Sequence, residues 1–407
     1  MSSLNPAHTV HSAYENAAHP PWRMWMAAWI ITAVFILSNS ATPLYVRWQA
    51  AIGFSSATLT VIFAAYILGL LLTLLVAGQL SDRYGRKPVL VPGLAAALVA
   101  CVLFASAHSV AMLIAARFLS GVAVGVVVSA GMAAVVDLGG PERKRQASLI
   151  ASVSMVLGAG LGPLLAGGIA LLLAAPVIPI FAVELAVLLS ALAAILILPL
   201  KHHGTKADHG WQLHLPSVPR ANHRHLLFGI AVFGPGITAT SFVLALGPSL
   251  LSHLLGVTSP LIAGGMACAM FLTATGVQFA ARQFSVRTIF LCGAAATILS
   301  MAGIALAVIS SNVAALIVAA LLAGSGQGLG QLGGLTLIGL HVPGNHRAEA
   351  NAVLNIGGYI PAGLMPVATG FVIDRAGLSL GSTGFAVVLA IVALLGGMTV
   401  FHKLARD

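Results

Sequence analysis

Two ionisable residues, Arg117 and Glu184, stand alone inside long apolar stretches of this 407-residue chain. If those stretches cross a bilayer, each charge costs about 2.5 to 3.5 kcal/mol near its centre, so both residues are functional candidates by default. Arg117 lies about six residues, and Glu184 about seven, after the expected start of its helix, which at about 1.5 Å per residue puts both roughly 10 Å deep. The matching depth predicts that they can pair. Burial raises the proton affinity of a glutamate and a nearby guanidinium lowers it, and this competition suits a proton-coupled switch. The alternative is a static ion pair that only fixes helix packing.

A second concentration of charge lies in the stretch GQLSDRYGRKPVL, residues 78–90, in a chain of which only 7% is charged. Its first glycine permits close approach of another helix, its second permits a tight turn, and its aspartate can lie against the positive N-terminal end of a helix dipole. The arginines need acceptors on the same side of the membrane, and the nearest acids in the topology are Asp137 and Glu142. The sequence therefore predicts a charged cluster formed by Asp82, Arg83, Arg86, Lys87 and Asp137, in a loop shaped by Gly78 and Gly85.

The composition indicates which elements position these residues. The chain is 59% hydrophobic with a mean hydropathy of +1.02, so it has more apolar surface than a water-soluble globule can bury. Its apolar runs are long enough to cross a bilayer as helices and do not alternate as barrel strands do. They predict an all-α membrane protein with twelve transmembrane helices near residues 24–45, 57–78, 88–107, 111–136, 147–171, 176–199, 226–250, 259–280, 288–309, 312–340, 350–373 and 383–402.

Charge and internal similarity indicate the topology. One set of loops carries nearly all of the Lys and Arg, which by the positive-inside rule places both termini in the cytoplasm. Residues 113–125 align without a gap on residues 316–328, so the two sets of six helices are expected to be repeats. The predicted divisions are a cytoplasmic N-terminal tail (1–23), an N-terminal six-helix half (24–200), a cytoplasmic linker (201–225) and a C-terminal six-helix half with a short cytoplasmic tail (226–407).

Several other classes of site are not indicated. The net charge of +10 is dispersed in single residues and short runs, so nucleic acid is not an expected partner. Cys101, Cys268 and Cys292 each lie in an apolar stretch, and the histidines of the linker lack regular ligand spacing, so neither a disulfide framework nor a metal site is predicted. No cofactor is expected.

The charged loop and the twelve-helix layout resemble the major facilitator superfamily, whose loop between the second and third helices has the pattern G-x-L-x-D-R-x-G-R-K/R. The matching positions are Gly78, Leu80, Asp82, Arg83, Gly85, Arg86 and Lys87. The resemblance implies the major facilitator fold, with two pseudo-symmetric six-helix halves around a cavity that opens alternately to either side. It also implies a gating loop, whose charges link the halves in the outward-open state and separate in the inward-open one; topology anchoring alone is the alternative. Ala280 occupies the equivalent of Asp82 in the second half, so the gate is one-sided.

Two further patterns resemble the twelve-helix drug:proton antiporter branch of that family. In the fourth helix, residues 113–121 are similar to its L-x-x-x-R-x-x-Q-G pattern, with Arg117 at the arginine and Ser120 in place of glutamine. In the fifth, residues 158–167 are similar to its antiporter signature G-x-x-x-G-P-x-x-G-G. The matched residues are Gly158, Gly162, Pro163 and Gly167. Ordinary helix packing is the alternative for small residues at this spacing.

The helices expected in the second half contain no acid or base, and neutral polar groups suit a largely apolar or neutral solute. The candidate cavity residues are Asn39, Tyr45, Gln327, Gln331, Asn355 and Tyr359. We expect a monomeric secondary transporter of a bacterial inner membrane, not an enzyme, that exports a small amphipathic drug or metabolite by antiport with protons. A proton-coupled importer of an organic anion, with Arg117 as the anion's partner, and a non-transporting membrane sensor of the same fold are the alternatives.

Overall fold

The computed structural model describes residues 20–200, 218–343 and 346–404. Within these ranges the chain forms helices joined by short turns and contains no strand. Twelve helical spans of the described chain are long and apolar enough to cross a membrane. The prediction of an all-α membrane protein with twelve transmembrane helices is therefore confirmed. Most of the predicted N-terminal tail and most of the histidine-rich linker lie outside the described residues.

The first half contains six spans, and two of them are interrupted. In the first span, α2 (Pro21–Ser40) is followed by a 3-10 turn, Thr42–Leu44, and by α3 (Tyr45–Ile52). The turn contains Pro43, whose ring and missing N–H prevent regular α-helical bonding. The expected end of this span near residue 45 was too early, because a helix forms again beyond the proline. The remaining spans are α4 (Ser56–Tyr84), α5 (Arg86–Ala105), α6 (Val110–Val126) continued by a π-helical segment and α7 (Met132–Gly139), α8 (Lys144–Leu172) and α9 (Val177–Ile197).

The second half repeats this layout. Its first span is likewise extended, here by a π-helical segment over Leu250–Leu254. Side chains of Ser285 and Asn312 accept backbone N–H bonds where two of the later helices begin, which satisfies donors that a helix start leaves free. The spans are α10 (His223–Ser249), α11 (Pro260–Ala281), α12 (Val286–Ser310), α13 (Val313–His341), α14 (Arg347–Ala376) and α15 (Leu378–Lys403).

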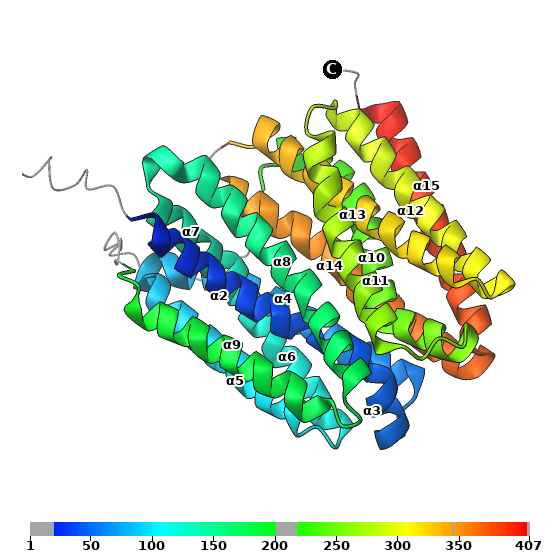
Figure 1. Ribbon diagram of the computed structural model, residues 1–407. Coiled ribbons are helices and arrows are strands. Elements are labelled where there is room, and N and C mark those ends of the chain that lie inside the picture. The colour runs from blue at the N-terminus through cyan, green and yellow to red at the C-terminus, as the bar shows by residue number, and fades with distance from the viewer. Residues whose placement is uncertain (1–19, 201–217, 344–345, 405–407) are drawn as a thin grey trace, which may run out of the picture.

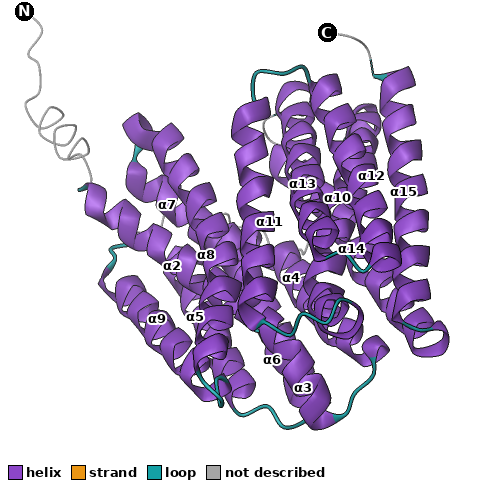
Figure 2. Ribbon diagram, turned by 45° about the vertical axis from the view of Figure 1, so that its right-hand side comes forward, coloured by secondary structure: helices purple, strands orange, loops and turns teal. Residues whose placement is uncertain are grey.

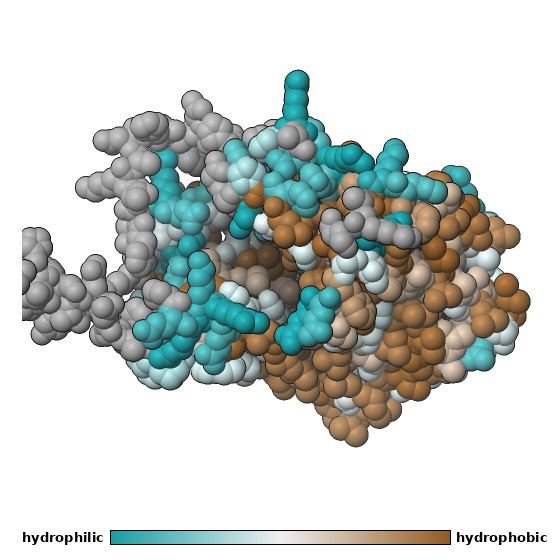
Figure 3. Space-filling view, turned by 90° about the horizontal axis from the view of Figure 1, so that it is seen from above, coloured by the Kyte–Doolittle hydropathy of each residue, from teal (hydrophilic) through white to brown (hydrophobic). Residues whose placement is uncertain are grey.

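The two halves form separate bundles that diverge toward one face of the molecule. Figures 1 and 2 show α2–α9 in one bundle and α10–α15 in the other, with the first and last described residues on the same face, called here the terminal face. The innermost span of each half, which contains α2 or α10, is more buried than the other spans. Viewed from the terminal face, the molecule is hollow between the bundles, and polar side chains surround the opening (Figure 3).

The bundles meet at the opposite face. There α8 packs against α11 and α4 packs against α14. Gly167 lies against the backbone of Pro260, and Gly264 lies against the backbone of Pro163. At both positions a Cβ atom would clash with that backbone, so only glycine allows the helices to approach this closely. Asp374 of α14 also accepts hydrogen bonds from the first backbone N–H groups of α4, at 2.9 and 3.1 Å. The molecule is therefore closed at the opposite face and open at the terminal face.

Candidate functional site

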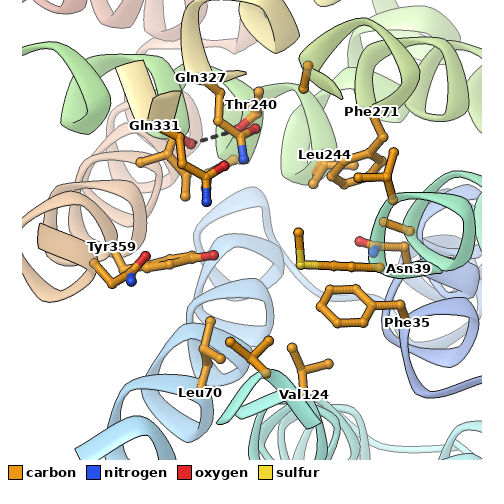
Figure 4. A pocket seen from close by; sticks show the side chains of 18 of the residues that line it. Phe35, Asn39, Leu70, Val124, Thr240, Leu244, Phe271, Gln327, Gln331 and Tyr359 are labelled. Atoms are coloured by element: carbon orange, nitrogen blue, oxygen red, sulfur yellow. Dashed lines mark hydrogen bonds between the residues drawn. The ribbon is translucent and has the colours of Figure 1, made fainter. Parts of the chain in front are cut away.

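A cavity of about 300 Å³ lies between the two halves. Its wall is formed by α2, α4, α6 with its π-helical continuation, α7 and α8 of the first half and by α10, α11, α13 and α14 of the second. Most of the wall is apolar, and it includes the rings of Phe35, Phe63 and Phe271. Figure 4 shows that side chains from both halves converge on the same open centre. A molecule held there would contact both halves at once.

Neutral polar groups project into this apolar cavity. Figure 4 shows the amides of Asn39, Gln327 and Gln331 and the hydroxyl of Tyr359 pointing toward its centre, and Asn355 also lines it. These five residues therefore lie where the sequence placed them. Within the described part of the chain, Oε1 of Gln327 has no hydrogen-bond partner, so it is free to accept a hydrogen bond.

Tyr45, the sixth residue expected in the cavity, lies elsewhere. It is fully buried, and it does not belong to the cavity wall. The turn at Pro43 redirects the chain, so the Tyr45 hydroxyl instead accepts a hydrogen bond from Nε of Arg117. Tyr45 thus supports a cavity residue and does not face the cavity itself.

Arg117 is the cation of the cavity wall. It is 1% exposed, and its Nη1 donates to the Ser38 carbonyl at 2.6 Å, near the C-terminal end of α2, where a positive charge is favourable. The rings of Tyr45, Phe63 and Tyr66 surround its guanidinium, with centroids 5.1 to 5.8 Å from Cζ. Its Nη2 has no partner among the described residues. An oxygen acceptor on a bound solute would satisfy this remaining N–H group.

Glu184 does not pair with Arg117, so the expectation that the two could pair is wrong. Oε1 of Glu184 is 2.5 Å from the hydroxyl of Ser40, and Oε2 has no partner among the residues that the structure describes. The reason is the position of α2, which packs against both α6 and α9. Each ionisable residue finds its partners on the first span, and equal depth in the membrane did not bring the two together.

A buried stack of rings lies close to Glu184 along α9. Phe181 precedes Glu184 by one turn of α9, and Trp48, Phe104 and Phe181 stack with centroids 5.3 to 6.2 Å apart. The thiol of Cys101 donates to the Phe181 carbonyl at 3.2 Å. Glu184 is 3% exposed and is not part of the cavity wall. It is therefore a buried acid separate from the solute cavity.

The charged cluster at the terminal face assembles around one arginine. Arg86 binds Asp82 through Nη1 at 2.7 Å and Asp137 through Nε at 3.0 Å. All three residues belong to the first half, so both ion pairs of this cluster lie within that half. Gly85 has φ +95° and makes the turn that the sequence predicted.

The other members of the gating loop have different surroundings. The Arg83 guanidinium lies 5.5 Å from the ring centroid of its neighbour Tyr84, and Lys87 donates to the Leu196 carbonyl at 2.8 Å. Gly78 was expected to permit a close helix approach, but no atom lies within 4 Å of where its Cβ would be. The expectation is wrong for this conformation, because the halves are apart at the terminal face.

The antiporter-like motif of α8 lies at two interfaces. Gly158 and Gly162 pack against the backbone carbonyls of Thr32 and Ile36 in α2. Pro163 and Gly167 face α11 in the other half. The motif therefore joins the innermost helix of its own half to the closed interface between the halves.

Three residues of this region did not emerge from the sequence. Tyr66 and Gln278 line the cavity, and Asp374 closes the opposite face. A polar ring in the middle of an apolar helix was an available signal for Tyr66. Asp374 falls one residue beyond the expected end of its span at residue 373.

Comparison with known proteins agrees with this architecture. The chain shows 33% identity over 112 residues to the multidrug resistance protein MdtL of Escherichia coli strain S88, covering 27% of this chain and 29% of MdtL. A point mutant of the nucleoside transporter NupG has a TM-score of 0.74 at 12% identity, covering 94% of this chain and 100% of NupG. An inward-facing, unoccupied bacterial homologue of the human lysosomal transporter Spinster has a TM-score of 0.70 at 14% identity, covering 95% and 98%.

The family itself follows from the sequence match. The model of the Major Facilitator Superfamily matches residues 24–283, more than half of the chain. The fold agrees with that match over both halves. The chain belongs to the Major Facilitator Superfamily and is a membrane transporter of that family, not an enzyme.

Proposed function

We propose that the protein exports small amphipathic organic compounds in exchange for protons. The observation that carries this proposal is the cavity between the halves, whose mostly apolar wall presents a few hydrogen-bonding groups. Such a wall binds a largely apolar solute and orients it through a few polar contacts. The partial similarity to MdtL supports a drug or a drug-like metabolite as the solute.

The charge distribution supports an orientation from which export can begin. The basic loops, among them the loop with Arg83, Arg86 and Lys87, lie on the terminal face, which the positive-inside rule assigns to the cytoplasm of a bacterial inner membrane. In that orientation the structure is inward-open, and a solute enters the cavity from the cytoplasm or from the inner leaflet. Its exit requires Asp374 to leave the start of α4 and the terminal face to close. Closure would bring the Asp82–Arg86–Asp137 cluster against the second half.

Recognition of the solute rests on two complementary groups. Arg117 Nη2 is a donor without a partner, and Gln327 Oε1 is an acceptor without a partner, in the described chain. A solute with a carbonyl or similar oxygen and with an N–H or O–H group satisfies both. The protein works as a monomer, because one chain supplies both walls of the cavity.

Proton coupling is assigned to Glu184. This acid is buried, has one free carboxyl oxygen and contacts the innermost helix of its half. An ionised carboxylate is costly in such surroundings, so a change in its charge alters the relative free energies of the two conformations. Proton and solute then compete through the conformational equilibrium, as antiport requires.

The test is flux in proteoliposomes with an imposed pH gradient. Chloramphenicol, a neutral amphipathic compound with an amide and hydroxyl groups, serves as the probe, and protein-free liposomes are the control. Movement of the probe against the proton flow supports antiport. Movement with the proton flow refutes it, and absence of protein-dependent flux for chloramphenicol and for the anion below supports the non-transporting sensor.

One observation favours a second candidate, a proton-coupled importer of an organic anion. Arg117 lines the cavity and its Nη2 has no hydrogen-bond partner, and no Asp or Glu is among the described residues that line the cavity. An anion such as benzoate would complete the hydrogen bonding of the guanidinium. Benzoate uptake driven by an inward proton gradient, without chloramphenicol export, would select this candidate.

A further inference from the structure

The hydroxyl of Ser40 reaches two acceptors but has a single hydrogen to donate. Ser40 Oγ is 2.8 Å from the carbonyl oxygen of Ile36 and 2.5 Å from Oε1 of Glu184. An ionised carboxylate only accepts hydrogen bonds, whereas a protonated one donates. If Ser40 donates its hydrogen to the Ile36 carbonyl, the hydrogen bond between Ser40 Oγ and Glu184 Oε1 must use a proton on Glu184. If Glu184 is ionised, Ser40 donates to it and the Ile36 carbonyl loses that donor.

Within the described residues, no other ionised group interferes with this exchange. The helix of Glu184, α9, packs against α2, α5 and α8. From α5, Cys101 is the ionisable group whose charge interacts with the carboxyl, and from α2 the contact is Ser40. The charged residues of α8 lie in its first turn at the terminal face, and no cation is within ion-pair distance of Glu184. The charge of Glu184 therefore depends on its own proton.

The Ile36 carbonyl and Ser40 both lie next to segments that join the two halves or reach the cavity. The Ile36 carbonyl lies against Gly162 of the antiporter-like motif. Ser40 ends α2, and the 3-10 turn that follows it, Thr42–Leu44, contacts α8, α10 and α11, where the halves close the opposite face. Directly after that turn, Tyr45 binds Arg117 in the wall of the cavity.

We propose that the Ser40 hydroxyl transmits the protonation state of Glu184 to the kink in the first span, and through Tyr45 and Arg117 to the solute cavity. The proposal rests on the proton-binding role of Glu184 given above. When Glu184 gains a proton, its O–H donates to Ser40 Oγ and the hydrogen of Ser40 bonds the Ile36 carbonyl. When the proton leaves, the hydrogen of Ser40 turns to the carboxylate. A serine bond to the carbonyl one turn earlier bends a helix, so making or breaking it redirects the segment that carries Tyr45.

The experiment measures the accessibility of the cavity as a function of pH. A reporter cysteine, Ser152→Cys, is placed in the cavity wall of full-length protein in which Cys268 and Cys292 are changed to serine. Its labelling by a membrane-impermeant maleimide is recorded in proteoliposomes across a pH series and divided, at each pH, by the labelling of the same cysteine in denatured protein, because the thiolate fraction itself depends on pH. We expect the labelling of the parent to change with pH by about fivefold, the shift that one net hydrogen bond can produce. Glu184→Gln and Ser40→Ala should both remove this pH dependence, and Ser40→Thr, which keeps the hydroxyl, should restore it.

A matched control lies on the same pair of helices. Ser190 of α9 accepts a hydrogen bond from Trp29 of α2 at 2.8 Å, so it joins these helices without contacting Glu184. Ser190→Ala should keep the pH dependence of the parent. If Ser190→Ala also removed it, the effect would be one of helix packing and the transmission through Ser40 would be refuted.

The outcomes separate this proposal from the proposed function. A pH dependence lost in Glu184→Gln but intact in Ser40→Ala refutes the role of Ser40 and leaves the proton site standing. A pH dependence intact in Glu184→Gln refutes both. If Ser40→Ala does not fold, infrared difference spectra of Ser40→Cys provide the test. The carboxyl band of Glu184 is identified as the band that disappears in Glu184→Gln, and it must shift in Ser40→Cys, because a thiol is a weaker donor and acceptor than a hydroxyl. An unshifted band refutes the contact.

Discussion

In the first half, the innermost helix α2 contacts a buried arginine through Ser38 and a buried glutamate through Ser40. In the second half, the innermost helix α10 presents Thr240, Ser241 and apolar side chains to the same cavity, and the polar partners beside it are amides and a phenol. The two halves share a layout but differ in the chemistry of their centres. We propose that this difference divides the work, with proton coupling in the first half and neutral hydrogen bonding to the solute in the second.

The strongest test of this division is Glu184→Gln. The amide keeps the shape of the side chain but cannot exchange a proton, so proton-driven export should fall to the level of protein-free liposomes. Binding of the transported compound, measured by the thermal shift of purified protein, should stay within about twofold, because Glu184 lies outside the cavity. Unchanged gradient-driven export would move the coupling role to Asp82, Asp137 or another acid.

Arg117→Ala should have the next largest effect, and it should affect stability as well as binding. It leaves the Ser38 carbonyl and the Tyr45 hydroxyl without their donor in a buried site, which should lower the free energy of unfolding by about 2 kcal/mol. Binding should weaken roughly tenfold through loss of the free N–H group. Chemical denaturation and a titration of the solute measure the two effects.

Arg117→Lys is the matched control for that prediction. Lysine keeps the charge but lacks the planar guanidinium, whose separate N–H groups can bond Tyr45, Ser38 and a solute at the same time. Stability and binding should therefore recover only in part. Full recovery by lysine would show that the charge alone matters and that the fork geometry does not.

Asp374→Asn tests an acid of the second half that contacts the first half. The amide loses the charge and one of two hydrogen bonds to the start of α4, which should shift the equilibrium about fivefold toward opening of the opposite face. Labelling of a cysteine introduced at the opposite face measures the shift. Asp82→Asn at the terminal face serves as the control and should shift the equilibrium the other way, toward the inward-open state, if the gating loop acts as the family resemblance implies.

The smallest expected effect comes from Gln331→Ala in the second half. Loss of one neutral hydrogen bond to the solute should weaken binding about threefold, while the ratio of proton to solute flux remains that of the parent. Flux and binding measured on the same preparation check both values. A changed coupling ratio would break the division between the halves.

Much of this molecule could be predicted from its sequence. The twelve spans, the turn at Gly85, the grouping of Arg86 with Asp82 and Asp137, and five neutral residues of the cavity all follow from apolar run length, loop charge and residue type. These properties depend on position along the chain, because the number of residues from the start of a span gives the depth of each residue in the membrane. The assignment of the divisions at residues 24–200 and 226–407 stays a prediction.

Only the tertiary structure decided which side chains meet. Arg117 and Glu184 have matching depths, yet each binds the first span, because depth does not specify how a helix is rotated or which helix lies between two others. Tyr45 left the cavity because Pro43 redirects the chain just before it. Asp374 became a contact between the halves because α14 extends past its expected end. Sequence thus determined depth and polarity, while helix rotation and packing determined partners, since partners depend on atoms that are distant along the chain.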